Sequence, residues 1–123
     1  MMSNKIKKIL LKKRKSKIVC LTAYSENFAK ILDSHCDIIL VGDSMANVLY
    51  GMSNTHKLTL NNIIQHSISV RKGVKKSLMV VDMPKGSYSN PMKAKRNAKL
   101  IKKKTNCDAV KIESNNKNFK IIK

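Results

Sequence analysis

Apolar residues recur along the chain in two alternating patterns, one with spacings of three or four residues and one with short continuous runs. The first pattern is typical of the buried face of a helix, and the second of a strand buried in a parallel sheet. Helices are predicted over residues 3–15, 25–35, 59–73 and 91–104, and strands over 18–23, 38–41, 78–81 and 109–112. Because strands and helices alternate, the chain is predicted to be an α/β protein with a parallel sheet and right-handed crossovers.

Residues 37–44, Asp-Ile-Ile-Leu-Val-Gly-Asp-Ser, show the strand pattern most clearly. The apolar run is predicted to be a strand buried on both faces, and Asp43 lies where this strand ends. The third and fourth predicted strands also end on a carboxylate, at Asp82 and at Glu113. Because ligands bind at the C-terminal ends of parallel strands, we expect these three carboxylates to share one site.

The three carboxylates suit a hard divalent cation such as Mg²⁺, which prefers oxygen ligands. We expect Asp43 and Asp82 to be metal ligands, and Glu113 to be a ligand or to hold a bound water. Lys111 and Ser44 are expected to contact a substrate carboxylate. Each acid also has a structural interpretation: Asp43 as a turn residue, Asp82 as a capping group, and Glu113 as the ion-pair partner of Lys111.

The connection between residues 42 and 58 is long, polar and contains Gly51, which indicates an active-site loop. The role of His56 in this loop stays open. His35 and His66 share no metal-binding spacing with it, and both are predicted to be structural.

The composition is strongly basic, with 26 lysines and arginines against 7 acidic residues and a formal net charge of +19. Such a charge is common in proteins that bind nucleic acid. Lysine dominates and is scattered among Asn and Ile, which indicates a general residue bias, so a nucleic-acid role is not favoured. No apolar run is long enough to span a membrane. The cysteines are predicted to be reduced core residues of a cytoplasmic protein: Cys20, Cys36 and Cys107.

At 123 residues the chain is shorter than a complete (βα)₈ barrel, which takes about 250 residues. We divide it into a basic amphipathic helix in residues 1–17 and an α/β domain in residues 18–123. The helix is predicted to cover one end of the sheet rather than to lie on a membrane. The chain resembles the first half of a larger fold, with an unpaired strand expected at each edge of the sheet.

Four motifs between about Ile18 and Glu113 resemble those of ketopantoate hydroxymethyltransferases in order and spacing. They are Thr22-Ala-Tyr24, Val41-Gly-Asp-Ser44, Val81-Asp-Met-Pro84 with Gly86-Ser-Tyr88, and Ala109-Val-Lys-Ile-Glu113. The resemblance implies a (βα)₈ TIM barrel of the phosphoenolpyruvate/pyruvate superfamily, of which the chain has about the first four βα units. It also implies Mg²⁺ and transfer of a hydroxymethyl group from 5,10-methylenetetrahydrofolate to 3-methyl-2-oxobutanoate. The product is 2-dehydropantoate for pantothenate biosynthesis, and the intermediate is a metal-stabilised enolate.

The resemblance implies residue roles that agree with those above. Asp43 and Asp82 resemble the metal ligands, Glu113 a carboxylate at the metal or its water, and Ser44 and Lys111 the contacts to the keto-acid carboxylate. The family's general base is a glutamate in the C-terminal half, so this chain is expected to lack it. The family forms large homo-oligomers, and a partner chain that supplies the second half barrel is an alternative.

The chain departs from the family pattern at three places. Lys85 stands where an apolar or aromatic residue is usual, Ser114-Asn115 where Gly-Gly is usual, and His56-Lys57 in a loop that is usually more apolar. The roles of Lys85 and His56 stay open. Two alternative functions remain: another Mg²⁺-enolate C–C lyase, which turns over without folate, and a non-catalytic basic fragment that binds a partner chain or nucleic acid independently of Asp43.

Overall fold

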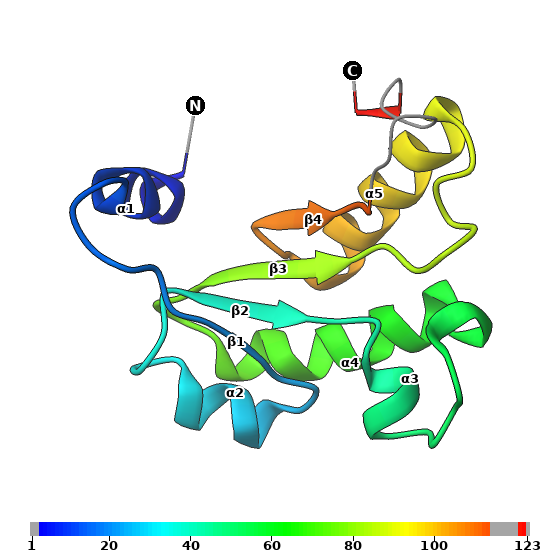
Figure 1. Cartoon of the computed structure of the whole chain (residues 1–123), viewed down its shortest axis with the longest axis horizontal. Coiled ribbons are helices and arrows are strands. Elements are labelled where there is room, and N and C mark those ends of the chain that lie inside the picture. The colour runs from blue at the N-terminus through cyan, green and yellow to red at the C-terminus, as the bar shows by residue number, and fades with distance from the viewer. Residues whose placement is uncertain (1–2, 114–120, 123) are drawn as a thin grey trace.

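Four parallel strands in the order β1-β2-β3-β4 form one sheet in the computed structural model, which describes residues 3–113 and 121–122 (Figure 1). The strands are β1 (Cys20–Thr22), β2 (Ile38–Val41), β3 (Leu78–Asp82) and β4 (Ala109–Lys111). The helices are α1 (Asn4–Lys12), α2 (Glu26–Leu32), α3 (Met45–Val48), α4 (Leu60–Gly73) and α5 (Pro91–Thr105), with a short 3₁₀ helix η1 (Thr55–Lys57). The predicted alternation of strands and helices is confirmed.

Local sequence sets the ends of the two longest helices. Thr59 caps α4 through a capping box, in which Thr59 and Asn62 each accept the other's backbone N–H. Asn90 caps α5, and Pro91 occupies the first turn, where a missing N–H breaks no helical hydrogen bond. Asn106 ends α5 in the left-handed conformation, with a φ of 50°.

Only one face of the sheet is covered by helices among the described residues. The helix α4 packs against α2 and lies along β2 and β3, and α5 lies along β4 (Figure 1). The strand residues fully buried against these helices are Ile39, Val41, Met79 and Val81. Ile38 and Leu40, which alternate with them in β2, are only half-buried. The prediction that β2 is buried on both faces is therefore wrong for the described chain, because no described element covers its second face.

The two edge strands are β1 and β4, as expected for part of a larger parallel sheet. Every residue of β1 is exposed, and the apolar side chains of Ile18 and Val19 just before it are exposed as well. Cys20 lies in this strand, so the prediction that all three cysteines are core residues is wrong for Cys20. Cys107 is buried and Cys36 is half-buried.

Asp33 ties the end of α2 to the start of β3. Its carboxylate accepts backbone N–H groups of Lys75 at 3.0 Å, Lys76 at 2.9 Å and Ser77 at 2.9 Å. Burial raises the pKa of Asp33, but the hydrogen bonds from Ser77, Lys76 and Lys75 outweigh this effect and lower the pKa below its usual value.

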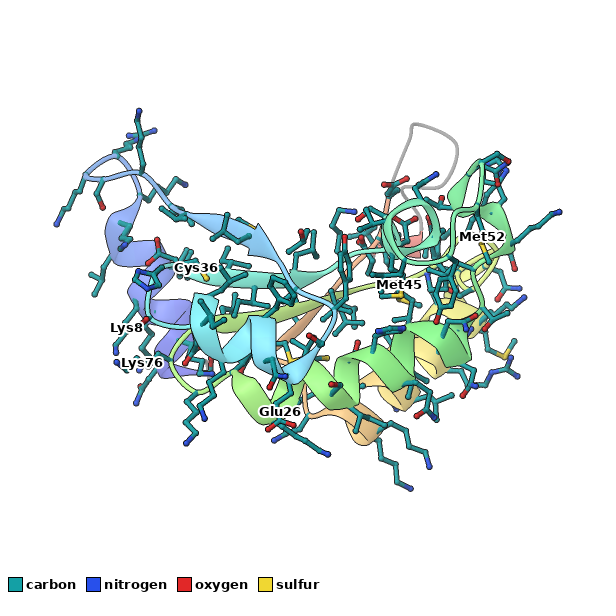
Figure 2. The ribbon with its side chains drawn as sticks, turned by 90° about the horizontal axis from the view of Figure 1, so that it is seen from below. Lys8, Glu26, Cys36, Met45, Met52 and Lys76 are labelled. Carbon is teal, nitrogen blue, oxygen red and sulfur yellow. The ribbon has the colours of Figure 1, made fainter. Side chains whose placement is uncertain are left out.

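The helix α1 lies at the end of the sheet where the strands begin (Figure 1). Lys12 Nζ pairs with Asp37 at 2.6 Å, and Lys5 Nζ donates to the carbonyl oxygen of Ser77 at 2.8 Å. Figure 2 shows Lys8, Cys36 and Lys76 at this end and Met45 and Met52 at the opposite end. No described residue of this helix is fully buried, although Ile6 and Ile9 are half-buried. Among the described residues, no helix is both long enough and apolar enough to cross a membrane.

The long connection after β2 contains two short helices, α3 and η1, where the sequence pattern predicts only a loop. Both are about one turn long, and such turns leave little periodicity in the sequence. Asn54 caps η1 by accepting the N–H of His56 at 3.0 Å. The connection is therefore an ordered segment, and α3 lies beside the C-terminal end of β2 (Figure 1).

Gly73 permits the close crossing of α4 and α2. A Cβ at Gly73 would lie 2.4 Å from the carbonyl oxygen of Glu26 and 2.7 Å from the backbone nitrogen of Lys30. Because these are backbone atoms, the steric clash can be relieved only if the two helices move apart. We expect Gly73→Ala to lower the free energy of unfolding by ~2 kcal/mol or more in urea denaturation. Lys72→Ala, at an exposed neighbouring position, is the control, and equal stability of the two variants would contradict the crossing.

Removal of the Asp33 carboxylate is expected to destabilise the fold in a pH-dependent way. Asp33→Ala should lower the free energy of unfolding by ~2 kcal/mol at pH 7, because three backbone N–H groups lose their acceptor. Since the folded-state pKa is lowered, this stabilisation is present above the unfolded-state pKa and is lost as the pH falls through the folded-state value. Urea denaturation of the wild type and of Asp33→Ala, from pH 7 to pH 3, measures this difference in the free energy of unfolding. Glu26→Gln, an exposed charge change in α2, should show a much smaller effect at every pH.

Candidate metal and keto-acid site

An ion pair between neighbouring strands lies at the C-terminal end of the sheet. Asp82 ends β3 and Lys111 ends β4, and the sheet register places them opposite each other. Lys111 Nζ donates to Asp82 Oδ1 at 2.7 Å. The Asp82 side chain is only 6% exposed, so its charge requires partners inside the protein.

Asp43 approaches Asp82 from the turn after β2. Its backbone N–H donates to Asp82 Oδ2 at 3.2 Å, so both oxygens of Asp82 have a partner. Gly42 leaves room in this turn for the Ser44 side chain, since a Cβ there would lie 2.9 Å from Ser44 Oγ. Burial raises the pKa of Asp43, and the charge of Asp82 raises it further. The two carboxylates therefore repel each other at a place where a bound cation would relieve the repulsion.

Lys111 is shared by two of the predicted site carboxylates. Its Nζ lies 3.5 Å from Glu113 Oε1 as well as 2.7 Å from Asp82. Burial lowers the pKa of Lys111, but the hydrogen bond to Asp82 and the charges of both carboxylates outweigh this effect and raise the pKa. The Glu113 side chain is 70% exposed, so Glu113 lies at the rim of the site.

Three side chains to which the sequence pattern assigns no role lie at this site: Tyr24, Thr55 and Tyr88. The Tyr24 hydroxyl lies 2.7 Å from Ser44 Oγ. The side chain of Thr55 forms a hydrogen bond with the Asp43 carboxylate. Burial raises the pKa of the Tyr88 phenol, and the carboxylate charges of the site raise it further. Tyr24 and Tyr88 lie in motifs that resemble those of the family, but the apolar periodicity gives none of the three a role, because separate loops bring them to the strand ends.

The three histidines have different settings, and none of their hydrogen bonds is to Asp43 or Asp82. His56 Nε2 lies 3.0 Å from Lys85 Nζ, so the two residues with open roles contact each other. His66 forms hydrogen bonds with the carbonyl oxygen of Tyr24 and the hydroxyl of Tyr50. His35 is exposed and precedes Cys36, which lies at the opposite end of the molecule from Met45 (Figure 2).

The oxygen donors near the strand ends fit a metal that is only partly enclosed by protein. In the described part of the chain, no three His, Cys, Asp or Glu side chains are grouped closely enough to hold a metal ion. Asp43 and Asp82 alone are brought together, and Glu113 reaches Asp82 through Lys111. Mg²⁺ commonly binds one or two carboxylates and completes its shell with waters and substrate oxygens. This donor set therefore fits Mg²⁺ better than a metal that needs four protein ligands.

Residues 3–123 match the sequence model of the family described as ketopantoate hydroxymethyltransferase. The chain belongs to this family. Over 122 residues it is 57% identical to the 3-methyl-2-oxobutanoate hydroxymethyltransferase of Pelagibacter ubique, with 99% of the chain and 48% of that relative covered. It is 54% identical over 97 residues to the Rhizobium etli protein of the same name, covering 78% of the chain and 36% of that relative.

The chain spans about half the length, or less, of the curated ketopantoate hydroxymethyltransferases that it matches. Among solved structures it resembles 2,3-dimethylmalate lyase, a member of the PEP mutase/isocitrate lyase superfamily, with a TM-score of 0.63. That superposition covers 96% of this chain and 42% of the other at 14% sequence identity, so it concerns the fold alone. The predicted fold, about the first four βα units of a TIM barrel, is confirmed.

The proximity of Asp43 and Asp82 has a direct consequence for titration. We expect Asp82→Asn to lower the pKa of Asp43, because it removes a like charge. The raised pKa means that protonated Asp43 favours the fold at low pH, and this contribution is lost as the pH rises through the folded-state pKa. A ¹³C NMR titration of the Asp43 carboxyl group measures the change.

Glu113→Gln is the matched control for that titration. The charge of Glu113 acts more weakly on Asp43 than the charge of Asp82 does, so its removal should lower the pKa of Asp43 less. An unchanged Asp43 pKa in Asp82→Asn, or a larger change in Glu113→Gln, would show that the two aspartates are not neighbours.

Proposed function

We propose that a barrel containing this chain transfers a hydroxymethyl group from 5,10-methylenetetrahydrofolate to 3-methyl-2-oxobutanoate and forms 2-dehydropantoate for pantothenate biosynthesis. One observation carries the proposal: Asp43, Asp82 and Lys111 meet at the strand ends in a chain of the ketopantoate hydroxymethyltransferase family. Two carboxylates beside an ammonium group suit a 2-oxo acid, whose oxo and carboxylate oxygens bind a metal and a cation respectively.

Asp43 and Asp82 are the residues that would hold Mg²⁺. When bound, the metal would polarise the 2-oxo group, acidify the neighbouring C–H and stabilise the enolate that attacks the methylene carbon. The raised pKa of Asp43 supports this role, because carboxylates that repel each other gain from a shared cation. Glu113 would lie at the rim, as a ligand or as the holder of a bound water.

Lys111 and Ser44 would bind the carboxylate of the keto acid. The Lys111 ammonium group is occupied by Asp82 and Glu113 in this structure, and its side chain is 41% exposed. Once the charge of Asp82 is neutralised by a cation, this ammonium group would be available to the substrate carboxylate. Ser44 follows Asp43 directly, and its hydroxyl group would donate a hydrogen bond to the same carboxylate.

The general base is proposed to come from the second half of the barrel. That half would also pair with the β1 and β4 edges, whether it belongs to the same polypeptide or to a partner chain. We propose that the complete barrel forms a homo-oligomer and acts in the cytoplasm. Nucleic acid is not a proposed partner.

Calorimetric titration of the chain with MgCl₂ and 3-methyl-2-oxobutanoate tests the site directly. We expect the keto acid to bind only when Mg²⁺ is present, and Asp43→Asn to weaken Mg²⁺ binding by ~10-fold or more. Asp37→Asn, which removes the same charge at the opposite end of the sheet, is the control. Keto-acid binding that is independent of Mg²⁺, or an equal loss in Asp37→Asn, would contradict the proposal.

A chimaeric barrel tests the transfer reaction. Residues 3–123 would be joined to the remaining C-terminal part of the Pelagibacter ubique relative, and formation of 2-dehydropantoate would be followed by mass spectrometry. We expect turnover to require 5,10-methylenetetrahydrofolate and to fall by ~100-fold or more in Asp43→Asn. Turnover of the keto acid without folate would instead support a lyase.

A further inference from the structure

A chain of hydrogen bonds connects Ser44 to the outer side of the molecule. Ser44 Oγ lies 2.7 Å from the Tyr24 hydroxyl, and the carbonyl oxygen of Tyr24 lies 2.8 Å from His66 Nδ1. His66 Nε2 lies 2.9 Å from the hydroxyl of Tyr50, whose ring meets the imidazole edge to face. Segments far apart in the sequence are therefore connected to Ser44, which is proposed to bind the keto acid.

The partners of His66 determine which ring nitrogen carries the proton. A carbonyl oxygen accepts hydrogen bonds and cannot donate, so Nδ1 must donate to the carbonyl oxygen of Tyr24. In the neutral imidazole, Nε2 is then an acceptor for the Tyr50 hydroxyl.

The backbone of Tyr24 needs such an anchor. Tyr24 lies between the end of β1 at Thr22 and the start of α2 at Glu26, outside both elements. The preceding N–H, of Ala23, still bonds to Leu40 across the sheet at 3.1 Å. His66 therefore fixes the carbonyl group two residues beyond the strand, and with it the position from which the Tyr24 side chain reaches Ser44.

We propose that Tyr24 and His66 are positioning residues that aim the hydroxyl proton of Ser44 at an anionic carboxylate. A serine hydroxyl has one proton, and when Tyr24 donates to Ser44 Oγ that proton is directed to another acceptor. The acceptor is the carboxylate of the 2-oxo acid, so the ligand in this inference rests on the proposed function. Tyr24 and His66 act through Ser44 and do not touch the substrate themselves.

Calorimetry on the full chain separates this role from a general loss of structure. We expect Tyr24→Phe to weaken Mg²⁺-dependent binding of 3-methyl-2-oxobutanoate by ~10-fold and to leave Mg²⁺ binding unchanged. His66→Leu should show the same split. His66→Asn keeps a side-chain N–H near the position of Nδ1 and should restore most of the affinity, whereas the exposed control His35→Leu should match the wild type.

The outcomes distinguish the inference from the proposed function. Loss of Mg²⁺ binding together with keto-acid binding in Tyr24→Phe, or unchanged keto-acid binding, would overturn the positioning role. If the wild-type chain binds Mg²⁺ but no keto acid, the proposed function fails without reference to any variant. The ¹⁵N NMR spectrum of His66 then decides the inference independently, because a proton on Nε2 instead of Nδ1 would overturn it.

Discussion

The charge of Asp82 is the feature on which the arrangement at the strand ends depends. This carboxylate is almost completely buried, and a buried carboxylate is costly unless its oxygens have partners. Its partners are the Lys111 ammonium group and the backbone N–H of Asp43. The parallel register of β3 with β4 provides the first, and the turn at Gly42 provides the second. A second carboxylate is thereby brought to the site.

The two ends of the sheet use acidic residues for different purposes. At the end where the strands begin, Asp33, Asp37 and Asp108 accept backbone N–H groups of neighbouring segments and hold strands and connections together. At the other end, Asp43 lies next to Asp82, and the charge of Asp82 adds to burial in raising the pKa of Asp43. The acidic residues that hold the fold together and those of the proposed ligand site are thus separated by the length of a strand, as is usual in folds with parallel strands.

Much of this arrangement can be predicted from the sequence. Continuous apolar runs identify the strands, capping residues such as Thr59 and Asn90 mark the helices, and the position of Asp82 after an apolar run indicates a site at the strand end. Contacts that depend on loop conformation cannot be predicted in this way. Tyr24 and Thr55 reach the site through connections without periodicity.

The sequence also does not predict which faces of the strands are buried. An apolar run indicates that a strand can be buried on both faces, but it does not say which segments cover each face. In the described residues the second face of β2 is open, and Cys20 is exposed at the sheet edge. The chain covers 48% of the Pelagibacter ubique relative. The open face and edges agree with this partial coverage, because a complete barrel covers its interior face and pairs all of its strand edges.

The central claim is that Lys111 exchanges Asp82 for a substrate carboxylate when a divalent cation binds between Asp43 and Asp82. A crystal structure of the chain with Mn²⁺ and 3-methyl-2-oxobutanoate tests it most directly, because anomalous scattering locates the metal. The account predicts the metal on both aspartates and Lys111 Nζ within hydrogen-bond distance of the keto-acid carboxylate. A metal bound elsewhere, with Lys111 still 2.7 Å from Asp82, would contradict it.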